Sequence, residues 1–414
     1  YIFISMSILG IYMKRVFVLS LTYLLGFSVS FASEISLVNA IKEGGAELSF
    51  RTRYEDVETV QKGAQAFTLR SRLTFETKQY NLLSALIEFD DITAMPDDEN
   101  YFTGDNGQVD DAIIQDAVGT ELNRIWLAYD IANTTIKYGR QNVSLDNERF
   151  FGKDAWRQNE QTFTGLSILN ESLNYLRISL AQLNQVEGVE GESSPSGKRN
   201  LNAQLVNAEY TGFPNSKLAL YSYWLDSNYV NNQEDTVTYG ARYSGRIKNS
   251  PEIDFALEYA KQNDAGGNML NYSADYALID FGVMYNNIRV GLGQEVLGAD
   301  SQGYFVTPMA SLHEFQGWTD QFQNQGLGNI VGGVQDRYLS VGFSCSEYFQ
   351  IKSIYHQFES ESRSAGLGDL GTEWGLEARA EVNEYTLNMK YAEYKQDDFG
   401  VDTEKFWLSV GAKF

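Results

Sequence analysis

The sequence has few of the residues on which many enzymes and metal sites depend. It contains one cysteine, Cys345, and two histidines, His313 and His356, in 414 residues. One cysteine excludes an intramolecular disulfide, and two histidines argue against a His-based metal site. Neither histidine has an assignable serine and acid in register, and there is no Gly-rich phosphate cradle. We therefore expect no enzyme, no metal and no other cofactor.

Proline is also scarce, and its positions are informative. Proline has no N–H to donate to a strand ladder, so it should be absent from strands that have neighbours on both sides. All five prolines fall in segments that connect apolar alternating runs: Pro96, Pro195, Pro214, Pro251 and Pro308. This distribution is typical of a sheet without free edges.

Long apolar runs are missing beyond the N-terminal region. Lys14 and Arg15 precede an apolar run over 16–27, and Ser30-Phe31-Ala32 has the small-x-small pattern of a cleavage site. We interpret residues 1–32 as an upstream extension plus a secretory signal peptide, and residues 33–414 as one domain. The rest of the chain lacks the ~20 apolar residues that a spanning helix needs, so membrane residence requires a barrel or a surface position.

The charge balance is strongly acidic, with 32 Lys and Arg against 55 Asp and Glu and a net charge of -23. Such an excess argues against a nucleic-acid partner and favours a solvated exterior. Aromatic residues are abundant, with 26 Tyr and 24 Phe. High Tyr and Phe content is typical of the interfacial girdles of membrane barrels.

The last nine residues alternate without a break between an apolar and a mixed face. The apolar face carries Phe406, Leu408, Val410, Ala412 and Phe414. A terminal strand that ends on an aromatic residue resembles the assembly signal of outer-membrane β-barrels. The resemblance implies that Phe414 is presented to the barrel-assembly machinery and that the apolar face meets outer-membrane lipid.

Eighteen short alternating runs follow one another from residue 46 to residue 414, and short and long connections alternate between them. The long connections are 92–119, 142–163, 184–199 and 298–336. Sorting of loops by length, with an even strand number, predicts an all-β fold. The predicted fold is a transmembrane antiparallel β-barrel of about 18 strands, with short periplasmic turns and long extracellular loops, in a Gram-negative outer membrane.

The same alternation assigns side chains to the lumen. It places Arg51, Arg53, Arg70 and Arg72 on one patch of the inner wall, and it brings Glu88 and Asp90 of the third strand beside Arg72 and Arg70. Two interpretations stay open. Either the inner wall is a set of mutually paired polar groups, or the arginines form an electropositive path for anions.

The third long loop is rich in arginine, amide and aromatic groups. It runs from Gly139-Arg140-Gln141 through Arg149-Phe150-Phe151 to Trp156-Arg157-Gln158. Over 138–163 the chain resembles outer-membrane porins of the alginate-export type. The resemblance implies a monomeric 18-stranded barrel that conducts anionic or polar oligosaccharide through an Arg-lined constriction. Alternatively, these groups satisfy one another as an internal brace.

We predict a porin for passive diffusion of small polar solutes, with an anionic, alginate-like oligosaccharide as the favoured substrate. The alternatives are a general trimeric diffusion porin and a non-conducting surface barrel or adhesin. The candidate pore-lining residues are Arg51, Arg53, Arg70, Arg72, Arg124, Lys137, Arg140, Arg149, Arg157 and Arg177. The candidate lumen acids that pair with them are Glu88 and Asp90.

Overall fold

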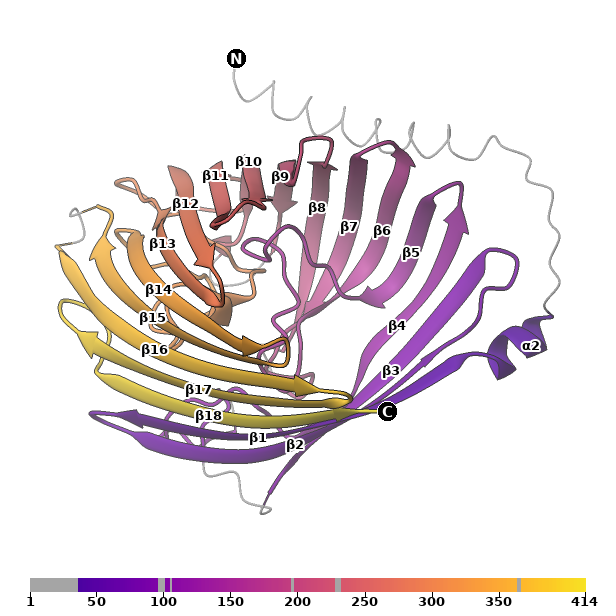
Figure 1. Cartoon of the computed structure of the whole chain (residues 1–414), viewed down its shortest axis with the longest axis horizontal. Coiled ribbons are helices and arrows are strands. Elements are labelled where there is room, and N and C mark those ends of the chain that lie inside the picture. Colours follow the sequence, from indigo (N-terminus) through magenta and orange to yellow (C-terminus); the bar gives the residue numbers. More distant parts are fainter. Residues whose placement is uncertain (1–35, 96–100, 105, 195–196, 228–231, 363–365) are drawn as a thin grey trace.

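The chain forms a closed barrel of antiparallel strands (Figure 1). The structure is a computed structural model, and it describes residues 36–95, 101–104, 106–194, 197–227, 232–362 and 366–414. Each strand pairs with its neighbour in sequence, and β1 also pairs with β18, which closes the ring. The predicted fold class of 18 strands is therefore confirmed. The predicted signal peptide lies outside the described residues.

The strands follow one another around the barrel in chain order. Their bounds are β1 Gly45–Thr59, β2 Gly63–Glu76, β3 Leu83–Ala94, β4 Gly119–Ile131, β5 Thr134–Gln141, β6 Thr162–Leu173, β7 Leu176–Glu187, β8 Lys198–Tyr210, β9 Ser216–Leu225, β10 Thr236–Ile247, β11 Glu252–Asp264, β12 Ser273–Tyr285, β13 Ile288–Leu297, β14 Val334–Ser346, β15 Phe349–Ser360, β16 Asp369–Val382, β17 Tyr385–Gln396 and β18 Thr403–Lys413.

Several strands extend further toward the long loops than the apolar alternation predicts. For example, we expect the first strand over 46–55, but β1 continues to Thr59, where its backbone still pairs with β18. The extension has a simple cause, because ladder pairing continues where both faces are polar and periodicity gives no signal. A short helix, α2 (Leu37–Lys42), precedes β1 and is capped by the Ser36 side chain. In the described residues, no helix has the length and apolar character to cross a membrane.

The outer face of the barrel is apolar. On β13, for instance, Val290 and Leu292 are 45% and 65% exposed, whereas the alternating residue Glu295 faces inward and is buried. Buried polar side chains are common on the inner wall, as the alternation predicts for a strand between lipid and a polar lumen.

Two long loops fold into the lumen, and Figure 1 shows the β5–β6 connection passing inside the ring of strands. The segment 142–161 joins β5 to β6, and the segment 298–333 joins β13 to β14. Gly152 N–H donates to the Met309 carbonyl at 2.8 Å, which ties the loops together. Phe150, Phe151 and Phe305 belong to one apolar cluster with wall residues. The position of the 298–336 segment, which the sequence left open, is therefore inside the barrel mouth.

The apolar outer face generates the first prediction. We expect Leu292→Arg to lower the free energy of unfolding in lipid bilayers by about 2–4 kcal/mol. The side chain of Leu292 points outward near the middle of β13, so the substitution places a charge in the apolar part of the bilayer. Urea unfolding in vesicles, followed by tryptophan fluorescence, measures the change.

Ile288→Arg is the matched control on the same strand and the same face. Ile288 begins β13 directly after a short turn, so we expect a cost of about 0–1 kcal/mol near the interface. Equal costs at the two positions would contradict a lipid-facing belt.

Candidate functional site

The arginines of the first hairpin share one patch of the inner wall, as predicted. The β1–β2 register places Arg51 opposite Arg70 and Arg53 opposite Thr68. The β2–β3 register places Arg72 opposite Asp90, whereas Arg70 stands opposite Ile92. The expectation that Asp90 pairs with Arg70 was therefore wrong, because the true register shifts the acids toward the turn.

Arg72 and Arg124 are neutralised by carboxylates. Arg72 lies 2.6 Å from Asp90 and 2.9 Å from Glu160 of the β5–β6 loop. The Arg124 guanidinium binds Glu88 through two nitrogens, as in a bidentate pair. These ion pairs neutralise both cations locally and join the wall strands to one another and to the loop.

Arg51 and Arg70 differ from Arg72 and Arg124, because no carboxylate among the described residues lies within ion-pair distance of Arg51 or Arg70. Arg51 donates to Gln158 Oε1 at 2.9 Å and to the Ala155 carbonyl at 3.1 Å. Arg70 donates to the Gln158 carbonyl at 3.2 Å. Their guanidinium groups therefore contact amide and carbonyl oxygens of the loop in place of a carboxylate.

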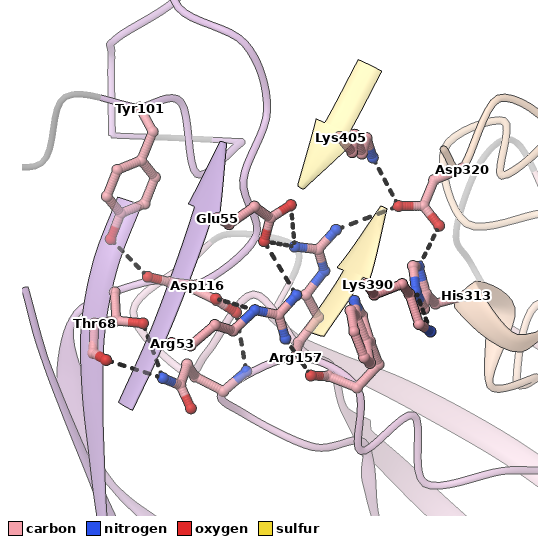
Figure 2. Close-up of polar contacts among 12 residues, drawn as sticks. Arg53, Glu55, Thr68, Tyr101, Asp116, Arg157, His313, Asp320, Lys390 and Lys405 are labelled. Atoms are coloured by element: carbon pink, nitrogen blue, oxygen red, sulfur yellow. Dashed lines mark hydrogen bonds and ion pairs between the residues drawn. The ribbon is translucent and has the colours of Figure 1, made fainter. Parts of the chain in front are cut away.

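A buried ion network joins the wall to the same loop (Figure 2). Glu55 of β1 lies 2.8 Å from Arg157 of the loop and 3.1 Å from Arg53 of its own strand. Arg53 also lies 3.4 Å from Asp116, which precedes β4. Glu55 and Asp116 are 0% exposed. Because an unpaired buried charge is costly, these contacts hold the loop in place.

Asp320 of the second inward loop extends this network. It lies 3.3 Å from Arg157 and 2.8 Å from Lys405 of β18. The nearby cations Lys405 and Arg157 hold the pKa of Asp320 below its usual range in spite of burial. Asp320 therefore bridges both loops and the wall as a carboxylate.

His313 is held neutral beside Asp320. Its Nδ1–H donates to Asp320 at 2.9 Å, and its ring stacks on Trp156 with centroids 4.2 Å apart. Burial lowers the pKa of His313 to about 3, although the Asp320 charge acts in the opposite direction. Lys390 donates to His313 Nε2 at 3.3 Å and lies 3.9 Å from the Trp156 ring centroid. His313 is thus a neutral residue of the second inward loop that packs against the wall at Lys390 and Trp407.

Arg140 and Arg149 form ion pairs that hold the β5–β6 loop against the barrel wall. Arg149 is 0% exposed, lies 2.7 Å from Glu295 and donates to Thr307 at 3.0 Å. Arg140 lies 3.2 Å from Glu187. Next to it, a Cβ on Gly139 would lie 2.2 Å from the Ile125 carbonyl oxygen, and the φ of +132° also favours glycine. The contacts of these two arginines therefore agree with the hypothesis that the loop groups satisfy one another as an internal brace.

The alternation missed three acids of the network. Glu55 follows Arg51 and Arg53 at spacing two, so the inward phase could have identified it. Asp116 belongs to the 92–119 connection, which we expected to be a long extracellular loop, but it is fully buried. The sequence did not indicate a role for Asp320, because a loop sequence does not specify which wall residue each of its side chains contacts. His356, which had no assignable partner, lies 2.9 Å from Asp336 on the adjacent strand.

Two cavities lie beside the network. The inner chamber, of about 900 Å³, is lined by Arg51, Arg53 and residues of β15 to β18. The outer chamber, of about 700 Å³, is lined by Arg157, Asp320, Lys405 and the outer ends of β1 and β18. Asp154 is the one described residue that lines both chambers. We call the position of Asp154, between the two chambers, the neck.

Asp154 has a distinctive electrostatic environment at the neck. It lies in the loop between β5 and β6, and its Oδ1 is inaccessible and has no hydrogen-bond partner among the described residues. Burial raises the pKa of Asp154 to about 7, although Arg157 acts in the opposite direction. Its charge therefore changes near neutral pH.

Of the remaining candidates, Lys137 and Arg177 line a third, smaller cavity at the opposite wall. The structure thus brings Arg51, Arg53 and Arg157 to the two chambers. It places Arg72, Arg124, Arg140 and Arg149 in ion pairs.

No protein-family model and no curated protein sequence matches this chain. The fold is similar to the crystal structure of Acinetobacter baumannii OccAB2, with a TM-score of 0.71, 14% identity and coverage of 91% of this chain and 98% of that chain. It is also similar to Pseudomonas aeruginosa OpdK crystallised with vanillate, with a TM-score of 0.69, 13% identity and coverage of 90% and 99%. At such identities the likeness shows the fold alone. Neither name refers to alginate export.

The buried network generates a prediction about stability. We expect Glu55→Gln to lower the free energy of unfolding by roughly 3 kcal/mol, because it leaves Arg53 and Arg157 buried without their shared carboxylate. Urea titration of the detergent-solubilised barrel measures the change.

Glu381→Gln is the control, since it removes an acid whose ion pair with Arg379 is about half exposed on both sides. Exposed pairs contribute about 0–1 kcal/mol. If Glu55→Gln costs no more than Glu381→Gln, the network does not hold the loop.

Proposed function

We propose that the chain is a passive channel that conducts small anionic solutes across the outer membrane of a Gram-negative bacterium. The observation that carries the proposal is the position of Arg51, which lines the inner chamber and hydrogen-bonds to oxygens of the β5–β6 loop, with no described carboxylate within ion-pair distance. A narrow passage with low-dielectric walls focuses such a charge on passing ions.

The fold supports this proposal in two ways. An apolar outer face and a polar inner face suit a barrel with lipid outside and water inside. The similar protein OpdK was crystallised with vanillate, a small aromatic carboxylate. Planar guanidinium groups recognise carboxylates through paired hydrogen bonds.

The division of the lumen favours compact solutes over long chains. Loop residues fill much of the barrel with packed apolar clusters, and the two chambers share only Asp154 among the described residues. A single carboxylate or a short uronate fits this arrangement. Alginate-like oligosaccharide stays in the proposal as the larger member of the same anionic class.

Arg51 provides the direct test of anion preference. We expect Arg51→Gln to lower the anion-to-cation permeability ratio about fivefold, because one unpaired unit charge in a narrow wet passage changes an ion's energy by roughly 1 kcal/mol. Reversal potentials of single channels in a potassium chloride gradient measure the ratio.

Arg289→Gln is the control, because Arg289 is inward-facing but is paired with Asp254 and lines neither chamber. We expect its ratio to stay at the wild-type value. A wild-type barrel that carries no current, or one that prefers cations at pH 6, would overturn the proposed function. Added benzoate and diuronate blockers then compare small with larger carboxylates.

Asp154 predicts a pH dependence near neutrality. With its pKa raised to about 7, the carboxyl is neutral below pH 7 and charged above it. A charged carboxylate repels anions, so we expect anion preference to rise as pH falls from 8 to 6. Reversal potentials measured across this range test the expectation.

Asp154→Asn should remove the pH step and hold the channel at its low-pH preference. Glu377→Gln is the matched control, because Glu377 lines the inner chamber away from the neck, and it should retain the step. The same pH step in Asp154→Asn would show that another group titrates.

A further inference from the structure

The short helix α2, which precedes β1, presents an exposed apolar face. Leu37, Val38 and Ile41 are 56%, 57% and 49% exposed, and Ala40 is the one buried residue of the six in the helix. At 3.6 residues per turn, the three exposed apolar side chains lie within about 100° of one another around the helix axis. Asn39 lies on the opposite side. The helix is therefore amphipathic, and its apolar face is open to its surroundings.

The length of α2 implies that this face has a partner. An isolated helix of six residues is not stable in water, because the cost of forming its first turn is not recovered over so few residues. The Ser36 side chain caps the N-terminus, and Ala40 packs against the barrel. One cap and one buried methyl group offset little of that cost. A further apolar contact along the exposed face would stabilise the helix.

The junction between α2 and β1 lies on the outer side of the barrel wall. On β2, the Thr74 hydroxyl donates to Glu88 of the inner wall, so the next residue, Phe75, faces outward. A Cβ on Gly44, which links α2 to β1, would lie 2.7 Å from the Phe75 ring. Figure 1 shows α2 projecting from the start of β1, clear of the ring of strands. The helix is thus continuous with the apolar outer face.

The helix also lies at the level of the short turns. The Ala40 carbonyl accepts a hydrogen bond at 2.9 Å from the N–H of Lys78, which lies in the short connection between β2 and β3. Short connections are on the periplasmic side of outer-membrane barrels. This contact holds α2 at the periplasmic edge of the apolar outer face, where lipid headgroups meet acyl chains.

We propose that α2 is an interfacial anchor in the periplasmic leaflet of the outer membrane, with Leu37, Val38 and Ile41 among the acyl chains. The partner of the helix is therefore a phospholipid surface, which is where helices with one apolar and one polar side lie. The anchor fixes the start of β1, the strand that closes the barrel by pairing with β18. The inference goes beyond the proposed channel and shares with it only the premise that the barrel spans a membrane.

Nitroxide labels on the full chain in phosphatidylcholine vesicles test the proposal. The background is Cys345→Ser, because Cys345 is exposed and would also react. We expect a label at Ile41→Cys to lie about 5–10 Å inside the boundary between headgroups and acyl chains. Molecular oxygen should therefore relax this label more than a water-soluble nickel chelate does.

Asn39→Cys is the matched control, because Asn39 lies on the opposite side of the same helix, and nickel should relax its label more than oxygen. Leu37→Asp combined with Val38→Asp makes the apolar face polar. We expect this pair to move the Ile41 label into water and to leave the reversal potential unchanged, because α2 lines neither chamber. Gel mobility before and after boiling checks that each variant is folded.

The outcomes separate the anchor from the channel. An Ile41 label that nickel relaxes more than oxygen does, in a folded and conducting barrel, would overturn the anchor alone. A label shielded from both reagents would also overturn it, because protein rather than lipid would then cover α2. A barrel that carries no current but holds the Ile41 label in lipid would overturn the channel alone.

Discussion

The arrangement of the lumen depends on the rule that charge taken out of water must be paired. Glu55 lies fully buried between Arg53 of the wall and Arg157 of the β5–β6 loop. Removing either contact would leave an uncompensated ion in a low-dielectric interior. The loop is therefore fixed at one place on the wall, and the cavities form around it.

The arginines fall into two classes once their partners are known. Arg72, Arg124 and Arg149 each meet a carboxylate and act as supports. Arg51 and Arg70 meet only carbonyl and amide oxygens. The two interpretations of the inner wall, mutual pairing and an electropositive path, therefore describe different parts of the same hairpin.

One loop borders all three cavities. Residues 142–145 line the third, smaller cavity, Lys153 and Trp156 line the inner chamber, and Arg157 and Gln161 line the outer chamber. Asp154 stands where the two chambers meet. The same segment forms an ion pair with β1 and backbone hydrogen bonds with the second inward loop, so its position contributes to the shape of all three cavities.

The sequence by itself determined the barrel. A period of two assigns each strand residue to lipid or lumen, and the loop lengths order the strands, because both signals are local. This reasoning found Arg51 and Arg53, and it extends to Glu55, whereas Arg157 was singled out by the composition of its loop and by a resemblance. Only the tertiary structure decided which cations are paired, because Asp116 and Asp320 reach the network from distant loops. Loop sequences carry no periodic signal, and long-range closure brings their charges together.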